Sequence, residues 1–255
     1  MKKEIKLLSI VIPYYNRRQL LINTLKSIAR YKRYYPIEII IIDDGSSKEH
    51  QIYDIEQVIP VLPIKLLVLE RKEGKWRGPT IAYNIGFSQV KGDVVMINSS
   101  ECYHNGDILG YVFNKMEDNE YISFSTYMGN VDLTKKIEEG MHRFSTKVKG
   151  TAYWGSHSSN YTLIPYCAAI CTKDLETLSG YDERFEFGVG YDDYDFTDRI
   201  KNLGLNTKLV DDPFIIHQWH QPTVYPNKVN INLLFSLREK DPNRVKAKTN
   251  KIYLK

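Results

Sequence analysis

The chain has 255 residues, of which 42% are hydrophobic and 26% charged, a composition that excludes a disordered chain and fits a globular protein. Its formal net charge of +4 is too small to call for nucleic acid, and we expect no nucleic-acid partner. The chain has no apolar run of about 18 residues, so we expect no transmembrane segment. The three cysteines form no metal-ligand pattern, and their odd number argues against a disulfide framework, which favours a reducing, cytoplasmic location, either free or peripheral to a membrane.

The first half of the chain alternates apolar runs with amphipathic segments. The apolar runs, rich in Val, Ile and Leu as in strands covered on both faces, are 7–13, 37–47, 64–70 and 92–101. Helices are expected at 17–34, where apolar residues recur on one face, and at 80–90. This order predicts a single α/β domain, Rossmann-like, with a mostly parallel central sheet flanked by helices.

The second half is less regular. The elements expected there are a helix at 107–117, a strand at 122–128, a long loop over 129–160, a strand and short helix within 163–182, a helix from Tyr191 to Gly204 and a strand over 206–220. We assign 1–101 to a nucleotide-binding half and 102–222 to an acceptor and catalytic half of one domain, 1–222. Residues 223–255 form a basic C-terminal extension, whose end, 238–255, is expected to be an exposed helix or a frayed tail.

Polar side chains gather where the first-half strands end, and ligands of such sheets bind beyond the carboxyl ends of the strands. These side chains are Asn16, Asp43, Asp44, Glu70, Arg71 and the run Ser99 to Glu101. In IIIIDDGSS a carboxylate can accept a hydrogen bond from a base imide or a ribose hydroxyl, and the glycine leaves room for a ligand. The alternative is an Asx-type turn with a helix cap. A GxGxxG fingerprint and a P-loop are both absent.

Two places in the sequence offer metal ligands. Ser99, Ser100 and Glu101 follow a buried strand, where oxygen groups can hold Mg²⁺ or Mn²⁺, although such a run is also an ordinary turn. His217 and His220 end the last strand, and either can offer a neutral imidazole to a metal or serve only the structure.

The stretch FGVGYDDYDF places Asp192, Asp193 and Asp195 between glycines and aromatic residues. A carboxylate whose pKa is raised by crowded neighbours suits a general base that activates an acceptor hydroxyl. Capping of the following helix would explain one of the acids. Asp198, further along, is interpreted as a surface group or as a partner of Arg199 or Arg184.

Taken together, the motifs resemble those of the family 2 glycosyltransferases with the GT-A fold. The matching segments, spread over residues 7–220, are SIVIPYYNR, IIIIDDGSS, AYNIGFSQVKGDVVMINSSE and FGVGYDDYDFTDRIKNLG. The last segment is also similar to galactosyltransferase and polypeptide N-acetylgalactosaminyltransferase variants. The resemblance implies an inverting transfer from a nucleotide sugar, most often a UDP-sugar, to a carbohydrate or glycoprotein acceptor.

The resemblance also assigns roles to individual residues. The resemblance and the strand-end positions described above predict a set of residues that bind the nucleotide sugar. These residues are Pro13, Tyr14, Tyr15, Asn16, Asp43, Asp44, Arg71, Arg77, Asn84, Ser99 and Ser100. Tyr15 would stack on uracil and Asp44 would accept from its imide. The arginine of the family's Ala-Arg-Asn motif is replaced by Tyr83 in Ala82-Tyr83-Asn84, so the diphosphate contact is expected from Arg71, Lys75 or Arg77.

The Asp-x-Asp metal motif of the family falls on Ser99-Ser100-Glu101, in which only Glu101 keeps a carboxylate. Glu101 with His217, and His220 as a second candidate, would therefore hold Mn²⁺ or Mg²⁺. Asp193 takes the place of the catalytic base and Asp192 that of the acceptor-binding acid. Trp154 and Tyr191 are candidates to stack on acceptor sugars, the alternative being plain core or loop aromatics.

Two other functions compete with this hypothesis. A non-catalytic relative that binds sugar nucleotides or glycans is favoured by the altered metal motif and opposed by the intact acids at 192–195. A nucleotidyltransferase would need a glycine-rich basic loop after the first strand, and PYYNRRQ lacks the glycines.

Overall fold

The structure is a computed structural model of the chain, and it describes residues 2–70, 77–145, 152–154, 163–221 and 228–249. No helix within these residues combines the length and apolar character needed to cross a membrane.

The fold is built on one mixed sheet with the strand order β3-β2-β1-β4-β8-β6-β9-β5, and β7 pairs with β6. The strands are β1 (Leu8–Tyr14), β2 (Ile37–Asp43), β3 (Ile64–Val68), β4 (Val94–Asn98), β5 (Cys102–Asn105), β6 (Glu120–Met128), β7 (Ala152–Trp154), β8 (Cys167–Cys171) and β9 (Asn206–His217). The first four strands are parallel, as expected. Beyond β4 the pairing becomes mixed, because β8 runs antiparallel to both β4 and β6.

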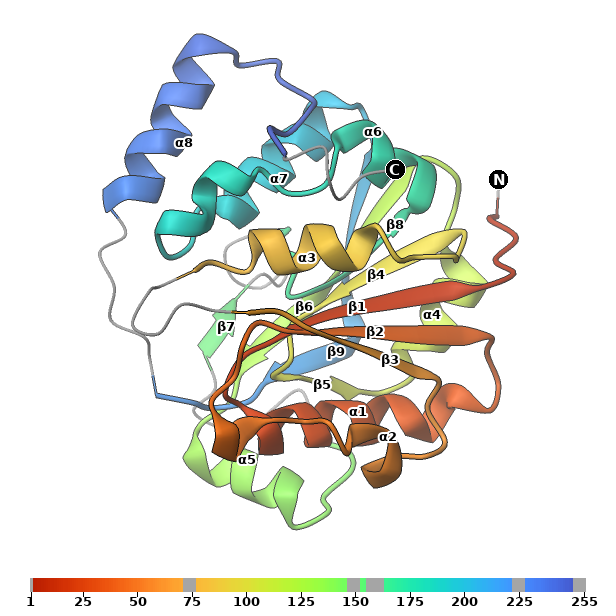
Figure 1. The fold of residues 1–255 in the computed structure, drawn as a ribbon. Helices are drawn as coiled ribbons and strands as arrows, with labels where there is room; N and C mark the ends of the chain where they lie inside the picture. The colour runs from red at the N-terminus through yellow and green to blue at the C-terminus, as the bar shows by residue number, and fades with distance from the viewer. Residues whose placement is uncertain (1, 71–76, 146–151, 155–162, 222–227, 250–255) are drawn as a thin grey trace.

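Helices cover both faces of the sheet, as Figure 1 shows, with α1 and α2 on one side and α3, α6 and α7 on the other. The helices are α1 (Arg18–Lys32), α2 (Ile55–Val58), α3 (Thr80–Phe87), α4 (Ile108–Lys115), α5 (Val131–Glu138), α6 (Thr172–Leu178), α7 (Asp192–Asn202) and α8 (Lys228–Lys240), with 3₁₀ turns η1 (Lys48–His50) and η2 (Glu183–Phe187). Strand β1 shows why both faces are covered: Ile10 and Ile12 belong to the core under α1, whereas Val11 belongs to the core under α3.

Two regions differ from the sequence-based expectation. The long loop predicted over 129–160 contains helix α5, which Asn130 caps by accepting a hydrogen bond from the backbone N–H of Leu133 at 2.8 Å. The chain after α8 is neither a helix nor frayed over 241–249. It is irregular but docked, with the N–H of Ala247 bound to the carbonyl of Leu178 at 2.9 Å.

Candidate active site

The ends of β1 and β2 are tied together by short hydrogen bonds. Asn16 has a left-handed backbone (φ 54°), its N–H donates to Ser46 Oγ at 3.0 Å, and its Oδ1 accepts from the Ser47 N–H at 2.8 Å. Asp43 Oδ1 accepts from the Ser46 N–H at 2.8 Å, an Asx-type turn. The alternative interpretation of IIIIDDGSS therefore holds for Asp43, and the adjacent Asp44 carries the remaining carboxylate of this loop.

Asp44 connects the tip of β2 to the region of α7. Its side chain is buried and forms an ion pair with Arg77, the residue that the sequence assigned to the donor diphosphate. The N–H of Gly78 donates to the carbonyl of Glu186 in η2 at 2.7 Å. Because η2 leads into α7, the early strand tips and the late acidic turn lie at one edge of the sheet. This is the convergence on which the sequence-based hypothesis depends.

The aromatic residues at the end of β1 differ in what they can reach. The ring of Tyr14 is buried and its hydroxyl donates to the carbonyl of His50 at 2.5 Å. Burial, followed by the Asp43 charge, raises the pKa of Tyr14 to about 12. Tyr15 follows the strand and is 39% exposed. Pro13 pairs with Ile42 within the sheet.

Glu101 and two histidines form a compact set of potential metal ligands, with all three ligand atoms within 4.8 Å of one another. Glu101 Oε1 lies 3.5 Å from His217 Nε2 and 3.6 Å from His220 Nε2. Oε2 accepts from Ser100 Oγ at 2.7 Å, and Arg17 Nη1 lies 2.6 Å from Oε1. Burial opposes ionisation of Glu101, but the two histidines and the Arg17 charge outweigh it and hold the pKa of this carboxyl well below its usual range.

The separations suit a bound ion. Ligand atoms about 2.1 Å from a metal are about 3.0 Å apart at a right angle and about 3.5 Å apart at a tetrahedral one. His220 Nδ1 donates to the carbonyl of Gln221 at 3.0 Å, which leaves Nε2 free to offer a lone pair, the usual arrangement of a metal-binding imidazole. The donor set of one carboxylate and two imidazoles therefore fits a divalent transition metal.

Gln218, which lies between the two histidines, was not identified from the sequence. It is fully buried, its N–H donates to the carbonyl of Glu101 at 3.0 Å, and its Nε2 donates to the same carbonyl at 3.1 Å. Asn23 of α1 donates to Gln218 Oε1 at 2.8 Å. Gln218 thus locks the end of β9 onto the Glu101 turn. A polar residue in an apolar strand end was the available signal.

The acid cluster stands at the start of α7. Tyr191 precedes the helix in a left-handed backbone conformation (φ 68°), which is strained for a bulky residue. Asp192 is buried and Asp193 partly exposed. Burial, with the Asp195 charge, raises the pKa of Asp192 to about 6. Burial, followed by the adjacent Asp192 carboxylate, raises the pKa of Asp193 well above its usual value.

Two tyrosines connect the acid cluster with the metal-ligand set. The pKa of Tyr83 is raised well above its usual value by burial and, among nearby charges, by both Asp193 and Glu101. The pKa of Tyr166 is raised by burial, by Asp193 and by Glu101. The Tyr166 ring also stands 5.2 Å from that of His217, edge to face. Asp193 and Glu101 therefore both lie near the same two tyrosines, Tyr83 and Tyr166.

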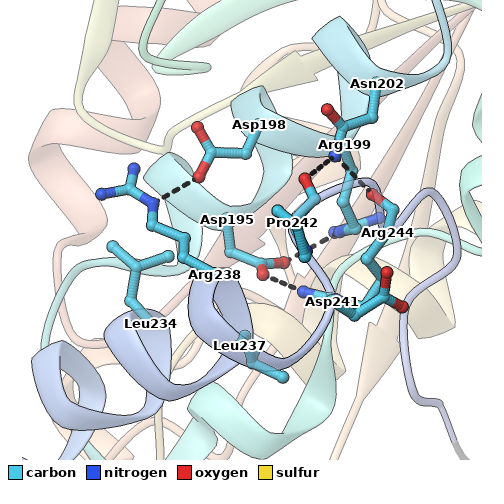
Figure 2. Close-up of a pocket in the computed structure, with 10 residues that line it drawn as sticks. All are labelled: Asp195, Asp198, Arg199, Asn202, Leu234, Leu237, Arg238, Asp241, Pro242 and Arg244. Carbon is cyan, nitrogen blue, oxygen red and sulfur yellow. Dashed lines mark hydrogen bonds and ion pairs between the residues drawn. The ribbon is translucent and has the colours of Figure 1, made fainter.

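Asp195 and Asp198 turn away from this site. Figure 2 shows them around a small cavity between α7 and the C-terminal segment, where Asp195 pairs with Arg199 and Arg244 and Asp198 pairs with Arg238. Asp198 is thus a partly exposed group, as one alternative held, but its partner is Arg238, since Arg199 pairs with Asp195 and Arg184 with Asp182. The three clustered acids are split between two functions, with Asp195 serving the packing of α7.

Other predicted site residues are placed as follows. Asn84 is fully buried; its Nδ2 donates to the Tyr181 carbonyl at 2.9 Å and to Glu183 Oε1 at 3.0 Å. The backbone N–H of Ser99 donates to the Tyr166 carbonyl at 2.9 Å. Binding of the nucleotide sugar by Asn84 and by Ser99 stays a prediction. The backbone of Trp154 pairs with Thr126 through β7. Arg71 and Lys75 lie outside the described residues.

The fold is shared with solved structures. The mannosyltransferase PcManGT from Pyrobaculum calidifontis, in complex with GDP-Man and Mn²⁺, matches with a TM-score of 0.59 and 17% identity over 86% of this chain and 58% of that one. TarS 1–349 from S. aureus, in complex with UDP-GlcNAc, matches with a TM-score of 0.62 and 20% identity over 86% and 61%. These likenesses establish the GT-A fold.

Sequence comparison gives the family. The uncharacterized glycosyltransferase YwdF of Bacillus subtilis (strain 168) is 29% identical over 161 residues, 57% of each protein. The uncharacterized glycosyltransferase RC0461 of Rickettsia conorii is 27% identical over 135 residues, 53% of this chain and 21% of that protein. The chain thus matches little more than half of the first relative and about a fifth of the second. The model of the family "Glycosyl transferase family 2" matches residues 9–177, so the chain belongs to this family.

Proposed function

We propose that this protein is a glycosyltransferase that moves a sugar from a nucleotide-sugar donor, a UDP-sugar in the first instance, to a hydroxyl of a glycan or protein-linked acceptor, with inversion at the anomeric carbon. Structures of the same fold contain UDP-GlcNAc or GDP-Man, which supports a nucleotide sugar. Tyr15 and Asp44 follow β1 and β2, and we propose them as the base contacts because ligands of such sheets bind beyond the carboxyl ends of the strands.

Asp193 is the proposed general base. The observation that carries this assignment is that, within the described residues, neither Asp192 nor Asp193 has an ion-pair partner, whereas Asp44, Glu101 and Asp195 are each paired with an arginine. Asp193 would accept the proton of the acceptor hydroxyl as that oxygen attacks the anomeric carbon and the nucleoside diphosphate departs from the opposite face.

The raised pKa suits this task, since a base is most effective when its pKa approaches the working pH. Asp192 would bind the acceptor, with Tyr191 and Trp154 stacking on its sugar rings.

Glu101, His217 and His220 are the proposed metal ligands, and an ion there would neutralise charge on the departing diphosphate. The two imidazoles favour Mn²⁺ over Mg²⁺, because Mg²⁺ prefers an all-oxygen set of ligands. The Mn²⁺ in the PcManGT complex supports the same choice. Within the protein, Ser100 and Gln218 orient the Glu101 carboxylate and its backbone.

The proposal is tested by donor hydrolysis, because a transferase without its acceptor can pass the sugar slowly to water. The purified chain is incubated with a panel of UDP- and GDP-sugars, with Mn²⁺, Mg²⁺ or a chelator, and release of nucleoside diphosphate is measured. We expect one donor to be consumed with Mn²⁺, more slowly with Mg²⁺ and hardly at all with chelator. NMR of the freed sugar should show the inverted anomer.

Asp193→Asn should lower the turnover by about 10²- to 10⁴-fold while donor binding changes little. The matched control is Asp198→Asn on the same helix, since Asp198 pairs with Arg238 at the surface and should not affect turnover. Equal activity in Asp193→Asn and wild type would reject the base assignment. Indifference to chelator and to Glu101→Ala would reject the metal.

A further inference from the structure

Arg17 occupies the position of a cation in the metal-ligand set. It precedes α1 as its N-cap residue, and its Nη1 stands 2.6 Å from Glu101 Oε1. The same oxygen faces Nε2 of His217 at 3.5 Å and Nε2 of His220 at 3.6 Å. The other carboxylate oxygen, Oε2, is taken by the hydroxyl of Ser100. The guanidinium therefore points at the one oxygen of Glu101 that would bind a metal.

A divalent ion and the guanidinium oppose each other at this oxygen. An ion shared by Oε1 and both imidazoles would be about 2.1 Å from the oxygen, against 2.6 Å for Nη1. Two positive groups so close repel strongly where burial limits screening, and the side chain of Glu101 is only 10% exposed. The ion pair as it stands and the bound metal therefore exclude each other.

Arg17 is placed so that only its side chain need move. Its backbone follows Asn16, which is fixed to Ser46 and Ser47 by hydrogen bonds. The Arg17 side chain is 29% exposed, and within the described residues Glu101 is its recorded partner. The guanidinium can thus move away from Glu101 toward solvent while the backbone of Arg17 stays in place.

We propose that Arg17 is a built-in competitor of the metal: it neutralises Glu101 in the metal-free protein, and a divalent ion must displace it to bind. This inference rests on the proposed metal role of Glu101, His217 and His220. The displaced guanidinium would remain at the β1 tip, beside the diphosphate that the ion is proposed to neutralise. Arg17 would then weaken binding of the metal alone and strengthen binding of a nucleoside diphosphate with metal.

The test compares Arg17→Gln with the neighbouring Arg18→Gln. Arg18 is also an arginine paired with a carboxylate, but its partner is Asp54, which it reaches with Nη1 at 2.8 Å and Nη2 at 2.6 Å, and not Glu101. Binding of Mn²⁺ alone is measured from the EPR signal of the free ion. We expect about tenfold tighter Mn²⁺ binding in Arg17→Gln, the size of effect that removing a competing charged hydrogen bond produces, and no change in Arg18→Gln.

A second measurement compares the affinity of wild type and Arg17→Gln for UDP and for GDP with saturating Mn²⁺. The effect should be opposite to that on Mn²⁺ alone: Arg17→Gln should bind the preferred nucleotide more weakly than wild type. A purely structural role for Arg17 would weaken both kinds of binding together. Arg17→Lys, which keeps a cation at the same position, covers the case in which Arg17→Gln fails to fold: it should restore wild-type Mn²⁺ affinity to within about threefold if the competing charge matters.

The outcomes separate this inference from the proposed function. Equal Mn²⁺ affinity in wild type and Arg17→Gln overturns the competitor and leaves the metal site intact. Binding only in Arg17→Gln supports the competitor and overturns a metal-dependent reaction in the wild type. Absence of Mn²⁺ binding in both proteins overturns both proposals.

Discussion

Arg244, in the segment that follows α8, lies between two buried carboxylates, and we predict that Arg244→Ala destabilises the protein by about 2 kcal/mol. Its Nη1 stands 3.0 Å from Asp182 Oδ2, and its Nη2 is paired with Asp195 of α7. The side chains of Asp182 and Asp195 are 0% and 3% exposed. Removing one partner of such a buried pair costs about 3–5 kcal/mol when the other charge is left alone.

The expected loss is smaller because each carboxylate keeps a second partner. Asp195 retains Arg199 Nε at 2.8 Å, and Asp182 retains Arg184 Nη2 at 2.7 Å. For a chain of this size, 1 kcal/mol corresponds to about 2–4 °C in Tm, so thermal unfolding followed by circular dichroism should show a fall of about 4–8 °C.

The matched control is Arg238→Ala, which removes another arginine around the same cavity (Figure 2). Arg238 Nε stands 2.7 Å from Asp198 Oδ2, but the two side chains are 45% and 35% exposed, and exposed pairs contribute only about 0–1 kcal/mol. Its Tm should fall by no more than about 2–4 °C. Equal shifts in the two variants would refute the reasoning that burial sets the cost.

Three further changes test other parts of the structure. Gly86→Ala would place a Cβ 2.4 Å from Val11 Cγ1 and 2.6 Å from Ile42 Cδ1, so overpacking should cost about 1–3 kcal/mol in denaturant unfolding. Because the pKa of Asp192 is raised to about 6 in the folded state, the contribution of this group to stability should fall as pH rises from about 4 to 6, by on the order of 3 kcal/mol, so the unfolding free energy of wild type relative to Asp192→Asn should decrease over that range. Burial and then the Arg30 charge lower the pKa of His104 to about 3, so the contribution of this group should be lost as pH falls below about 6.5, and the unfolding free energy of wild type relative to His104→Gln should decrease over that range.

The sheet could be predicted from the sequence wherever burial produces a continuous apolar run. The run 7–13 corresponds to β1, and 37–47 contains β2. A strand covered by helices on both faces buries the side chains of both faces, so its sequence is continuously apolar. The end of α7 was also predictable, since Gly204 adopts a left-handed backbone (φ 78°) that favours glycine. In each case the deciding interaction is local or repeats along one segment.

The second half escaped prediction where the deciding contacts are long-range. Helix α5 buries only Leu133, Thr134 and Ile137, a short apolar face among charged residues, although its Asn130 cap was a usable signal. The segment 241–249 is polar and has no periodic pattern, and it is held by hydrogen bonds to residues far away in sequence, such as Asp182. Composition cannot reveal a partner of this kind.

Some residues of the candidate site could likewise be proposed from the sequence, and others could not. The strand ends and the 192–193 acids could be found because their residue types and positions carry the chemistry. Arg17 could not, since its partner Glu101 is 84 positions away and an arginine after a strand has many possible uses. Gln218 was missed for the same reason, because its hydrogen bonds reach Asn23 and the Glu101 backbone.

The distribution of charge around α7 argues that the acid pair is kept for function. Arg244 and Arg199 neutralise Asp195, which points away from the proposed site, so the fold can pair an acid on this helix when stability is the only requirement. Asp192 and Asp193 have no such partner within the described residues, and they follow a strained Tyr191. Their raised pKa values mean that ionising them near neutral pH costs folding free energy. A general base needs such a raised pKa, whereas a helix-capping carboxylate does not. Capping alone therefore does not account for both acids.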